Sequence, residues 1–382
     1  MKPFNVYPLF DITPVKAKGI WLWDKNGDKY MDFYGGHAVI SIGHSHPYYT
    51  KMISDQLQKI GFYSNSVKIP LQEELAEKLG ELSGYNDYDL FLCNSGAEAN
   101  ENAIKLASFY NGRKKIISFS KGWHGRTSMA VAVTDDPPII APVNKTDNHL
   151  MLPFNDENAL ETAFKQNEVS GVIIEGIQGV HGVNVPKKEF LKKIRTLCDE
   201  YNAIMILDEI QSGYGRSGKF FAHQYSDVKP DIITVAKGMG NGFPVAGVLI
   251  SPKIKARHGM LGTTFGGNHL ACAASIAVLD VIKKEGLLEN ASKMGAYLMS
   301  KLKTIGGIKE LRGLGLMIGI ETLSPQSEIR NELLRNYKIF TGASPAENTI
   351  RILPSLAVKK EEVNLFVEAF EQVMSKMVVA QK

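Results

Sequence analysis

Two residues stand where the chain could carry out chemistry on a carbonyl compound: a lysine and an aspartate, each just after a short apolar run. Lys237 lies beyond the run 231–235 and is followed by a glycine; such a place favours a lowered amine pKa and nucleophilic attack. Asp208 follows the run 203–207, and ligands of open α/β sheets collect at the carboxyl ends of strands. Each residue alone also has an ordinary explanation, because most lysines are solvated and an aspartate often caps a helix.

A short polar loop before a helical pattern could bind a phosphate group. Ser95, Gly96 and Ala97 follow the apolar run 89–93 and lead into a segment of helical period. The free backbone N–H groups of a first helical turn attract anions, the serine adds a hydroxyl donor, and the glycine lets a phosphate approach the backbone closely. The alternative is a serine N-cap with a tight turn, a common arrangement that has no function of its own.

A second glycine pattern, GYGRSG at residues 213–218, fits the dinucleotide-binding motif GxGxxG. That motif requires a helix that begins at its third glycine and an acidic residue about 20 positions later, at the end of a strand. Here Gly218 leads into residues 219–223, which have no long amphipathic continuation, and the nearest acid, Asp231, would begin a strand. These departures argue against a nicotinamide-dependent dehydrogenase.

The lysine, the aspartate and the phosphate loop together meet the requirements of pyridoxal phosphate. Lys237 would form a Schiff base with the aldehyde, Asp208 would hold a proton on the pyridine nitrogen, and the start of the helix would take the phosphate. An aromatic side chain should support the ring, and Trp123 in the segment KGWHGRT (121–127) can supply that face. The combination predicts a pyridoxal-phosphate enzyme.

The elements that would position these residues alternate between strands and helices. Five apolar, β-branched runs lack inward–outward alternation, which is typical of strands buried on both faces of a parallel sheet; they are 115–119, 171–175, 203–207, 231–235 and 245–250. Segments of helical period lie before or between them, at 71–82, 98–110 and 190–201. This order predicts an α/β domain with helices on both faces of a mostly parallel sheet.

The two ends of the chain predict a second, smaller domain. Near the C-terminus the sequence favours helices and short strands, in an order that suits an α+β domain; the helices are 271–284, 288–304 and 360–377, and the strands lie near 312–321 and 350–353. The opening residues, with a turn signal at Asn26-Gly27, read as strands of the same small domain. We therefore expect residues 1–49 and 276–382 to form the small domain and residues 50–275 to form the large, cofactor-binding domain.

Composition argues against several other classes of protein. Among 382 residues, 44 Lys+Arg against 40 Asp+Glu leave a net charge of +4 without a basic cluster, so we expect no nucleic-acid partner.

Three scattered cysteines favour reduced thiols in the cytoplasm. His44 and His46 have no further ligands at suitable spacing, so we expect no metal. The N-terminus lacks a signal-peptide core and the most apolar stretch, 270–282, is too short to span a bilayer, so we expect no membrane partner.

Taken together, these segments resemble the class III aminotransferases, which belong to the fold-type I pyridoxal-phosphate enzymes. The resemblance extends from about residue 7 to residue 356 and is carried by NSGAEANE (94–101), WHGRT (123–127), EGIQG (175–179), LDEIQSGYGRSGKF (207–220), KG (237–238) and GTTFGGN (262–268). It implies a large domain around a mostly parallel sheet and a smaller α+β domain built from both termini. It also assigns the glycines of residues 213–218 to this family's motif.

The resemblance implies a role for each matching residue. Lys237 would bind the cofactor and move the proton in transamination, and Asp208 would pair with the pyridine nitrogen. The other implied cofactor contacts are Ser95, Gly96 and Ala97 to the phosphate, Gln211 to the phenolic oxygen, Trp123 and His124 beside the ring, and Thr264 from the neighbouring subunit. A threonine supplied by a neighbour implies a homodimer with shared active sites.

The resemblance also implies a substrate class. Arg126 and Arg351 match two carboxylate-binding arginines, a role that suits planar guanidinium groups, and Tyr7 and Thr263 stand where relatives have substrate contacts. Within the class, the compact chain and His124 are most similar to acetylornithine aminotransferases. The implied reaction transfers the terminal amino group of an N-acylornithine to 2-oxoglutarate in arginine biosynthesis, giving glutamate and N-acylglutamate 5-semialdehyde. Alternatives are an ornithine or 4-aminobutyrate aminotransferase and, in another class, a catalytically lapsed cofactor-binding regulatory protein.

One segment departs from the family pattern. Relatives usually read EPIQGE where this chain reads EGIQGV at residues 175–180, and their second glutamate pairs with the arginine matched here by Arg351. Val180 cannot form this pair, and an unpaired buried guanidinium costs several kcal/mol, of the order of 3–5 kcal/mol. Two explanations remain open: the donor brings a second carboxylate, as N-succinylornithine would, or His181, another nearby residue or a solvent anion compensates.

Overall fold

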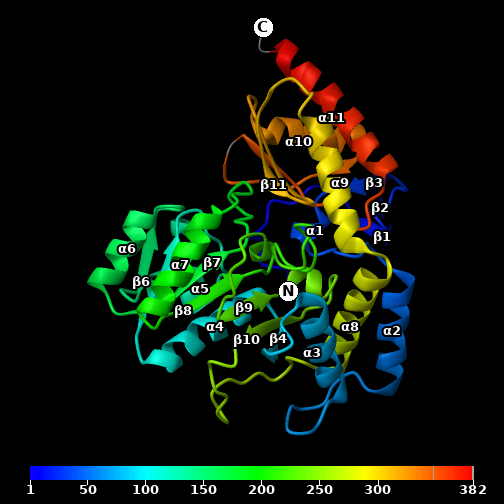
Figure 1. Cartoon of the computed structure of the whole chain (residues 1–382). Coiled ribbons are helices and arrows are strands. Elements are labelled where there is room, and N and C mark those ends of the chain that lie inside the picture. Colours follow the sequence, from blue (N-terminus) through cyan, green and yellow to red (C-terminus); the bar gives the residue numbers. More distant parts are fainter. Residues whose placement is uncertain (347, 381–382) are drawn as a thin grey trace.

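The protein is built around a seven-stranded sheet (Figure 1). The computed structural model describes residues 1–346 and 348–380. The strands follow one another in space in the order β4 (Asp89–Cys93), β10 (Ala246–Ile250), β9 (Ile232–Val235), β8 (Ile204–Asp208), β7 (Val169–Glu175), β5 (Lys115–Phe119) and β6 (His149–Leu152). Neighbouring strands pair in parallel from β9 to β6, which confirms the prediction of a mostly parallel central sheet.

Strand β10 corrects one expectation. The run 245–250 was predicted among the parallel strands, but β10 pairs antiparallel with both β9 and β4. The chain between β9 and β10 contains only a loop and a single 3₁₀ turn, Lys237–Met239. A parallel neighbour needs a crossover of a dozen or more residues, so this short connection forces the chain to reverse.

Helices cover both faces of the central sheet. On one face, Ile204 and Ile206 of β8 pack in the same cluster as Ala103 and Ala107 of α4 (Gly96–Asn111). On the other face, Met205 and Leu207 pack with side chains of α6 (Glu157–Gln166) and α7 (Lys188–Glu200). Because alternate residues of each strand are buried on opposite faces, the strands carry continuous apolar runs. The observed ends of the five predicted strands and three predicted helices lie within two residues of the expected ends.

The two ends of the chain form smaller sheets beside the central one. One sheet orders β1 (Pro14–Lys18), β2 (Trp21–Asp24), β3 (Lys29–Asp32) and β13 (Ile339–Phe340), and the other orders β11 (Ile308–Leu314), β12 (Met317–Thr322) and β14 (Thr349–Ile352). Strand β13 pairs in parallel with β3, so segments more than 300 residues apart lie side by side. The helices of this part are α9 (Leu287–Leu302), α10 (Gln326–Tyr337) and α11 (Lys360–Ala380).

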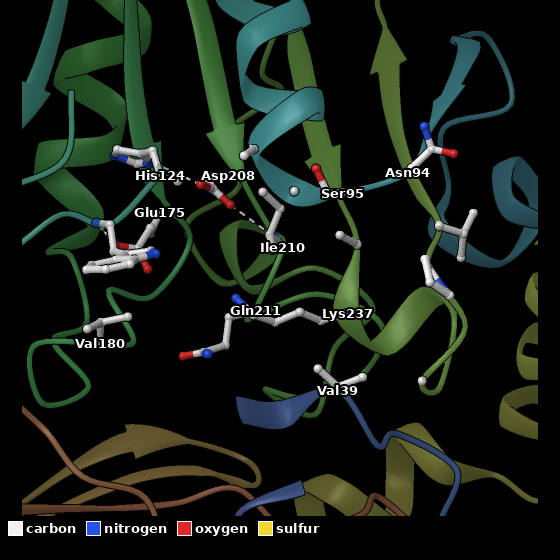
Figure 2. A pocket seen from close by; sticks show the side chains of 18 of the residues that line it. Val39, Asn94, Ser95, His124, Glu175, Val180, Asp208, Ile210, Gln211 and Lys237 are labelled. Carbon is white, nitrogen blue, oxygen red and sulfur yellow. Dashed lines mark hydrogen bonds and ion pairs between the residues drawn. The ribbon is translucent and has the colours of Figure 1, made fainter. Parts of the chain in front are cut away.

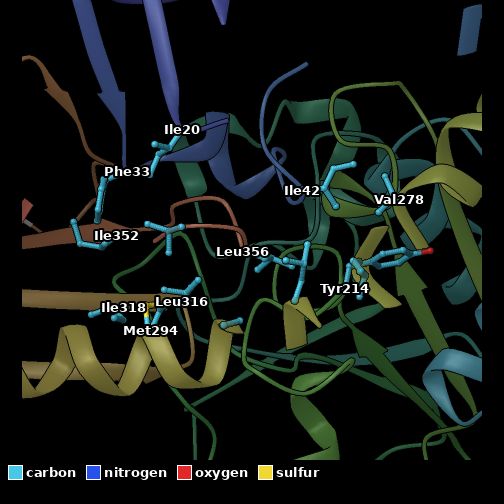
Figure 3. Close-up of a cluster of buried hydrophobic side chains, with 14 of the residues drawn as sticks. Ile20, Phe33, Ile42, Tyr214, Val278, Met294, Leu316, Ile318, Ile352 and Leu356 are labelled. Atoms are coloured by element: carbon cyan, nitrogen blue, oxygen red, sulfur yellow. The ribbon is translucent and has the colours of Figure 1, made fainter. Parts of the chain in front are cut away.

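The largest hydrophobic cluster joins these small sheets to the central one. Figure 3 shows Phe33 and Ile352 at one end of the cluster. Tyr214 lies at the other end, together with Val278, which belongs to α8 (His269–Lys284). The remaining helices are α1 (Gly35–Ala38), α2 (Pro47–Lys59), α3 (Pro70–Ser83) and α5 (Ser128–Ala132). In the part of the chain that the structure describes, no helix combines the length and apolarity that crossing a membrane requires.

Candidate active site

A cavity of about 300 Å³ opens at the carboxyl edge of the parallel strands. The ends of β7 and β8 and the segments after β4, β5, β8 and β9 all contribute lining residues, and Gly242–Val245, just before β10, complete the lining. Figure 2 shows Glu175 and Asp208, at the ends of β7 and β8, and Lys237, in the turn after β9, around one cavity. Nine predicted residues therefore share one cavity wall, namely Ser95, Gly96, Ala97, Trp123, His124, Asp208, Gln211 and Lys237, together with Val180 of the departing segment.

Lys237 has a backbone conformation that is uncommon outside glycine. Its φ is +42°, in the left-handed region, where a non-glycine residue stores strain and is often found at a functional site. The residue is partly buried and lines the cavity. Desolvation lowers the pKa of its amine, while the charges of Asp208 and Glu175 oppose that shift. An amine with a lowered pKa at the cavity wall is suited to exchange a proton there.

Asp208 is the last residue of β8 and is only 3% exposed. Its Oδ2 accepts one hydrogen bond from Asn100 Nδ2 at 2.8 Å and another from His124 Nδ1 at 2.8 Å, and its Oδ1 accepts the backbone N–H of Ile210 at 3.0 Å. Sequence reasoning gave Asn100 no role, although the residue lies in the NSGAEANE segment. A polar side chain at a core-facing position of a helix was the signal that could have found it.

The start of α4 combines the two explanations weighed for the phosphate loop. Ser95 is an N-cap whose Oγ accepts the N–H of Glu98 at 3.2 Å, and the Glu98 carboxylate accepts the N–H of Ser95 at 2.9 Å. The serine O–H proton is still available to a ligand. Gly96 packs so closely that a Cβ there would lie 2.9 Å from Ile210 Cδ1. Ser95, Gly96 and Ala97 all line the cavity, and any side chain at position 96 would have to displace Ile210.

Glu175 holds two loops of the cavity together. Its Oε1 accepts the N–H of Trp123 at 2.8 Å, and its Oε2 accepts the N–H of Gly179 at 2.9 Å. Burial raises the pKa of this carboxyl to about 7, against the opposing effect of His124. The indole of Trp123 is thereby fixed by its backbone on one side of the cavity.

Gln211 leaves a buried oxygen without a partner among the described residues. Its Nε2 donates to the carbonyl of His37 at 3.1 Å, while Oε1 is buried and unbonded. A Cβ at position 179 would lie 1.7 Å from this oxygen, so a side chain there would displace the Gln211 amide. An unsatisfied buried amide oxygen at a cavity wall points to a donor group that a ligand would supply.

Arg351 lies in β14, 4% exposed, and its Nη1 donates to the carbonyl of Gly179 at 3.4 Å. Its Nε donates to the carbonyl of Ala343 at 2.5 Å. Burial lowers the pKa of this guanidinium, and none of the ion pairs formed within residues 1–346 and 348–380 includes it. Val180, the neighbour of Gly179, presents an apolar side chain to the cavity. Position 180 therefore offers no carboxylate to Arg351.

His181 does not contact Arg351 through a hydrogen bond in the described part of the chain. The imidazole lies in a separate small cavity lined by Lys121, Arg312 and Thr349, among others, and its buried Nδ1 has no partner there. Burial lowers the pKa of His181. A neutral imidazole that lines another cavity, without a hydrogen bond to the guanidinium in the described residues, is poorly suited to compensate its charge.

Five predicted residues do not line the cavity of their own chain; Arg351, described above, is one of them. Arg126 is exposed, with its guanidinium 5.4 Å from the centre of the Trp123 ring. Thr264 is exposed, and Tyr7 is 67% exposed in the N-terminal segment. Thr263 is half-buried, and its Oγ1 accepts the N–H of Gly266 at 3.1 Å. A single chain therefore brings together the cofactor-side residues and leaves the predicted substrate side open.

The two histidines considered as metal ligands bind separate carboxylates. His44 Nε2 lies 2.9 Å from Asp32 Oδ2, and His46 Nε2 lies 2.9 Å from Glu285 Oε1. Across the residues that the structure describes, no three or more His, Cys, Asp or Glu side chains gather in a metal-binding arrangement.

Comparison with known proteins places this cavity in a family. The family model for class-III aminotransferases matches residues 4–374. The acetylornithine aminotransferase of Bacillus subtilis is 40% identical, over 97% of this chain and 97% of its own. Among solved structures, the ornithine aminotransferase of Toxoplasma gondii gives a TM-score of 0.92 at 28% identity, covering 100% of this chain and 94% of that one. The acetylornithine aminotransferase of Elizabethkingia anophelis gives 0.85 at 30% identity, with 98% and 96% covered.

The match extends over nearly the whole chain, so both the fold and the motifs of the site are included in it. It confirms the expected fold-type I architecture with its mostly parallel sheet, and it confirms the expected dependence on pyridoxal phosphate. The lysine, the carboxylates and the helix start that converge on one cavity are accordingly explained by common descent: the chain belongs to the class III aminotransferases, and it is a pyridoxal-phosphate-dependent transaminase.

Proposed function

We propose that this chain transfers the terminal amino group of an N-acylornithine to 2-oxoglutarate, a step of arginine biosynthesis. The observation that carries the proposal is the near-full-length similarity to the acetylornithine aminotransferase of Bacillus subtilis, 40% identical over 97% of both chains. The products would be glutamate and an N-acylglutamate 5-semialdehyde. Assaying the purified holoenzyme with N-acetylornithine and with N-succinylornithine, each with 2-oxoglutarate, tests the proposal directly, and a failure to form glutamate from either donor would overturn it.

The cavity has the shape and chemistry to hold pyridoxal phosphate. Two observations support this fit. The buried Oε1 of Gln211 has no hydrogen-bond partner in the described residues. Gly96 has no side chain, so a phosphate group could come close to its backbone at the cavity wall. Ser95, Gly96 and Ala97 would bind the phosphate, and Gln211 would face the phenolic oxygen. Trp123 and His124 would lie beside the ring. The bound cofactor supplies an electron-accepting pyridine ring to the carbon that bears the substrate amine.

The remaining steps fall to side chains of this chain. Lys237 Nζ would accept the proton from the substrate carbon that bears the amine and would return it to the carbon of the cofactor that carried the aldehyde. Desolvation favours the neutral, basic form of this amine. Asp208 would hold the pyridine nitrogen protonated through its carboxylate oxygens. The buried carboxyl of Glu175 fixes the backbone of Trp123 and excludes water from that side of the cavity.

A second copy of the chain would complete the active site. Apolar side chains are exposed along the N-terminal segment and near the loop that contains Thr264; they include Phe4, Leu9, Phe62, Tyr63 and Phe265. Contiguous exposed apolar surface commonly marks an interface between subunits. In the proposed homodimer, Thr264 of one subunit would reach the phosphate site of the other, which agrees with its position outside the cavity of its own chain.

Mixed dimers should test the sharing of active sites. Lys237→Ala and Thr264→Arg should each inactivate the homodimer, the first by removing the amine and the second by blocking the neighbour's phosphate site. When both variants are co-expressed, half of the dimers are mixed, and each mixed dimer has one intact site, so about a quarter of the parent activity should return. Purified mixed dimers that stay inactive, although both variants melt like the parent, would show that each site is built from one chain.

The surroundings of Arg351 bear on the choice of acyl group. In the described residues this buried guanidinium lacks a carboxylate partner, Val180 stands where relatives carry glutamate, and His181 faces another cavity. A donor that carries a second carboxylate would satisfy the charge. These observations support N-succinylornithine as the preferred donor over N-acetylornithine.

Donor preference and its dependence on position 180 can be measured together. We expect kcat/KM for N-succinylornithine to exceed that for N-acetylornithine by about tenfold, the effect of one charge-assisted hydrogen bond. Val180→Glu should remove most of this advantage because the new carboxylate would pair with Arg351. Val180→Gln, which is of the same size and uncharged, should retain it. A clear preference of the parent enzyme for N-acetylornithine contradicts the succinyl hypothesis.

A second candidate function is ornithine δ-amino transfer. It is favoured by the Toxoplasma gondii ornithine aminotransferase, whose TM-score of 0.92 exceeds the 0.85 of the Elizabethkingia anophelis acetylornithine aminotransferase. Comparing kcat/KM for free ornithine with that for the two acylated donors separates the candidates, because the acyl group is the difference between them.

We propose, finally, a domain division and a cellular setting. All seven central strands lie between residues 89 and 250, which supports a large domain at 50–275 and a small one from 1–49 and 276–382. The boundary at 275 falls inside α8, a helix that packs against α2 and α3, so α8 would connect the two domains. Three free, buried cysteines support a reducing, cytoplasmic setting.

A further inference from the structure

Asp208 is oriented by groups that are all hydrogen-bond donors. A carboxylate offers about four lone-pair positions on its two oxygens. Three are taken, by Asn100 Nδ2, His124 Nδ1 and the N–H of Ile210. The position that remains is on Oδ1, and Asp208 itself lines the cavity. The three bonds thus fix the direction in which the carboxylate can receive a ligand N–H.

Asn100 can adopt only one orientation of its amide. Its nitrogen donates to the carbonyl of His124 at 2.7 Å as well as to Asp208, and its oxygen accepts the hydroxyl of Thr234 at 2.8 Å. The carbonyl of His124 can only accept a hydrogen bond, so the amide nitrogen must face it. The flipped orientation would place the amide oxygen against that carbonyl and against the carboxylate. The amide is therefore a committed donor to Asp208.

The network ties together three elements that come from distant parts of the chain. Asn100 lies on α4, Thr234 on β9 and Asp208 on β8, and all three side chains are at most 3% exposed. Buried and fully satisfied polar networks are rigid, because any displacement leaves a polar atom unpaired at low local dielectric. Such a network holds a carboxylate within the narrow range of positions that a cofactor site requires.

We propose that Asn100, oriented by Thr234, is a positioning residue that aims the Asp208 carboxylate at the pyridine nitrogen of the bound cofactor. The inference rests on the proposed role of Asp208 and adds the residues that make this role possible. Asn100 does not line the cavity itself, so it acts through the groups that it binds there, the Asp208 carboxylate and the His124 carbonyl. Its contribution should appear in how tightly the cofactor is bound and in the rate of the donor half-reaction.

Two substitutions at position 100 separate aiming from simple packing. Asn100→Asp keeps the shape of the side chain but places an oxygen against the Asp208 carboxylate, whereas Asn100→Ala removes the donor and leaves a small cavity. Simple packing predicts that the alanine variant is the more damaged. The positioning role predicts the opposite order, because the aspartate variant repels Asp208 and the alanine variant only releases it.

The measurements are the dissociation constant of pyridoxal phosphate, followed by absorbance, the rate of the donor-only half-reaction, and the melting temperature of each apo-protein. We expect Asn100→Asp to weaken cofactor binding and slow the half-reaction by about ten- to hundredfold, Asn100→Ala by less, and Thr234→Val by about threefold to tenfold. Asn290 offers a matched control: its amide also donates two hydrogen bonds, in this case to the carbonyl oxygens of Leu356 and Val358, none of which line the cavity. Asn290→Asp should lower the melting temperature and leave cofactor binding within about twofold of the parent.

The outcomes distinguish the two levels of the proposal. If Asn100→Asp binds the cofactor as tightly as Asn100→Ala or the parent, the positioning role is wrong. Should Asn100→Asp fail to fold, Thr234→Val decides, since parent-like binding and rate in that variant contradict the network. If Asp208→Asn itself leaves binding and rate unchanged, the role of Asp208 is wrong, and the failure lies in the proposed function of that residue.

Discussion

Replacing Lys237 with alanine should abolish transamination while leaving a folded protein that still binds pyridoxal phosphate. The variant loses both the covalent attachment of the cofactor and the base that moves a proton, and each of these contributes several orders of magnitude. We expect kcat with any amino donor to fall by at least about 10⁴-fold. Formation of glutamate from 2-oxoglutarate provides the measurement.

The structure explains why no neighbouring group can substitute for this amine. The acidic groups that act on Lys237 in the cavity are Asp208 and Glu175. Both are carboxylates that already accept hydrogen bonds from backbone or side-chain donors. The neighbouring cation, Arg351, has a guanidinium that is protonated in any accessible pH range. Removing Lys237 therefore leaves the cavity without a neutral amine.

A matched lysine in the same family motif is the control. Lys219 follows the GYGRSG segment, and its Nζ donates to the carbonyl of Gln224 at 3.0 Å, outside the cavity. Lys219→Ala should retain parent-like kcat. If Lys237→Ala retains activity within tenfold of the parent, or if its bound cofactor has the parent absorbance spectrum, then the assignment of this lysine is wrong.

The sequence predicted the cofactor side of the site well because that side is built from local signals. Apolar runs predicted where β8 and β9 lie. Because these strands are buried on both faces, the first polar residue that follows each run lies at the edge of the sheet. Asp208 and Lys237 were found in this way. The phosphate loop was found because Ser95 and Gly96 carry the ordinary signals of a helix start.

What the sequence did not predict depends on contacts between distant residues. Asn100 lies 108 positions from Asp208 along the chain, and no local pattern indicates that α4 turns this side chain towards β8. The left-handed backbone of Lys237 depends on the turn into β10, a strand whose direction was also not predicted. The unpredicted α10 and β6 are short or polar segments in which few side chains are buried.

The substrate side was predicted by resemblance, and a single chain leaves it open for a physical reason. Arg126, Thr264 and Tyr7 are exposed on their own subunit. A residue that serves a neighbour's site has to protrude from its own subunit, so its local sequence cannot show where it acts. Arg351 differs, because β12 pairs with β14 and brings it to the Gly179 carbonyl within the same chain.

Replacing Asp208 with asparagine should have the second largest effect, on the order of 10³-fold in kcat, the scale seen when one preorganised electrostatic contact is removed from an active site. The substitution keeps the shape of the side chain and removes its charge. It also creates a conflict: the new amide nitrogen or oxygen must face Asn100 Nδ2 and His124 Nδ1, both of which are donors. The oxygen would therefore stay with these donors, and the amide nitrogen would face the cavity or Ile210, where a carboxylate oxygen is required.

Charge and aim can be separated by comparing three variants of the same purified enzyme. Asp208→Glu keeps the charge but displaces the oxygens by one methylene group, so it should retain more activity than Asp208→Asn, and Asp208→Ala should retain the least. Asp280→Asn is the control, since Asp280 accepts hydrogen bonds from Tyr48 and Lys78 on the side of α8 away from the cavity; it should leave kcat within about twofold. Because a protonated pyridine nitrogen absorbs and reacts differently from a neutral one, the absorbance of the bound cofactor should change in all three Asp208 variants and in no control. An unchanged spectrum and rate in Asp208→Asn would mean that the nitrogen is protonated by another group, and the geometry at the end of β8 would then need a different explanation.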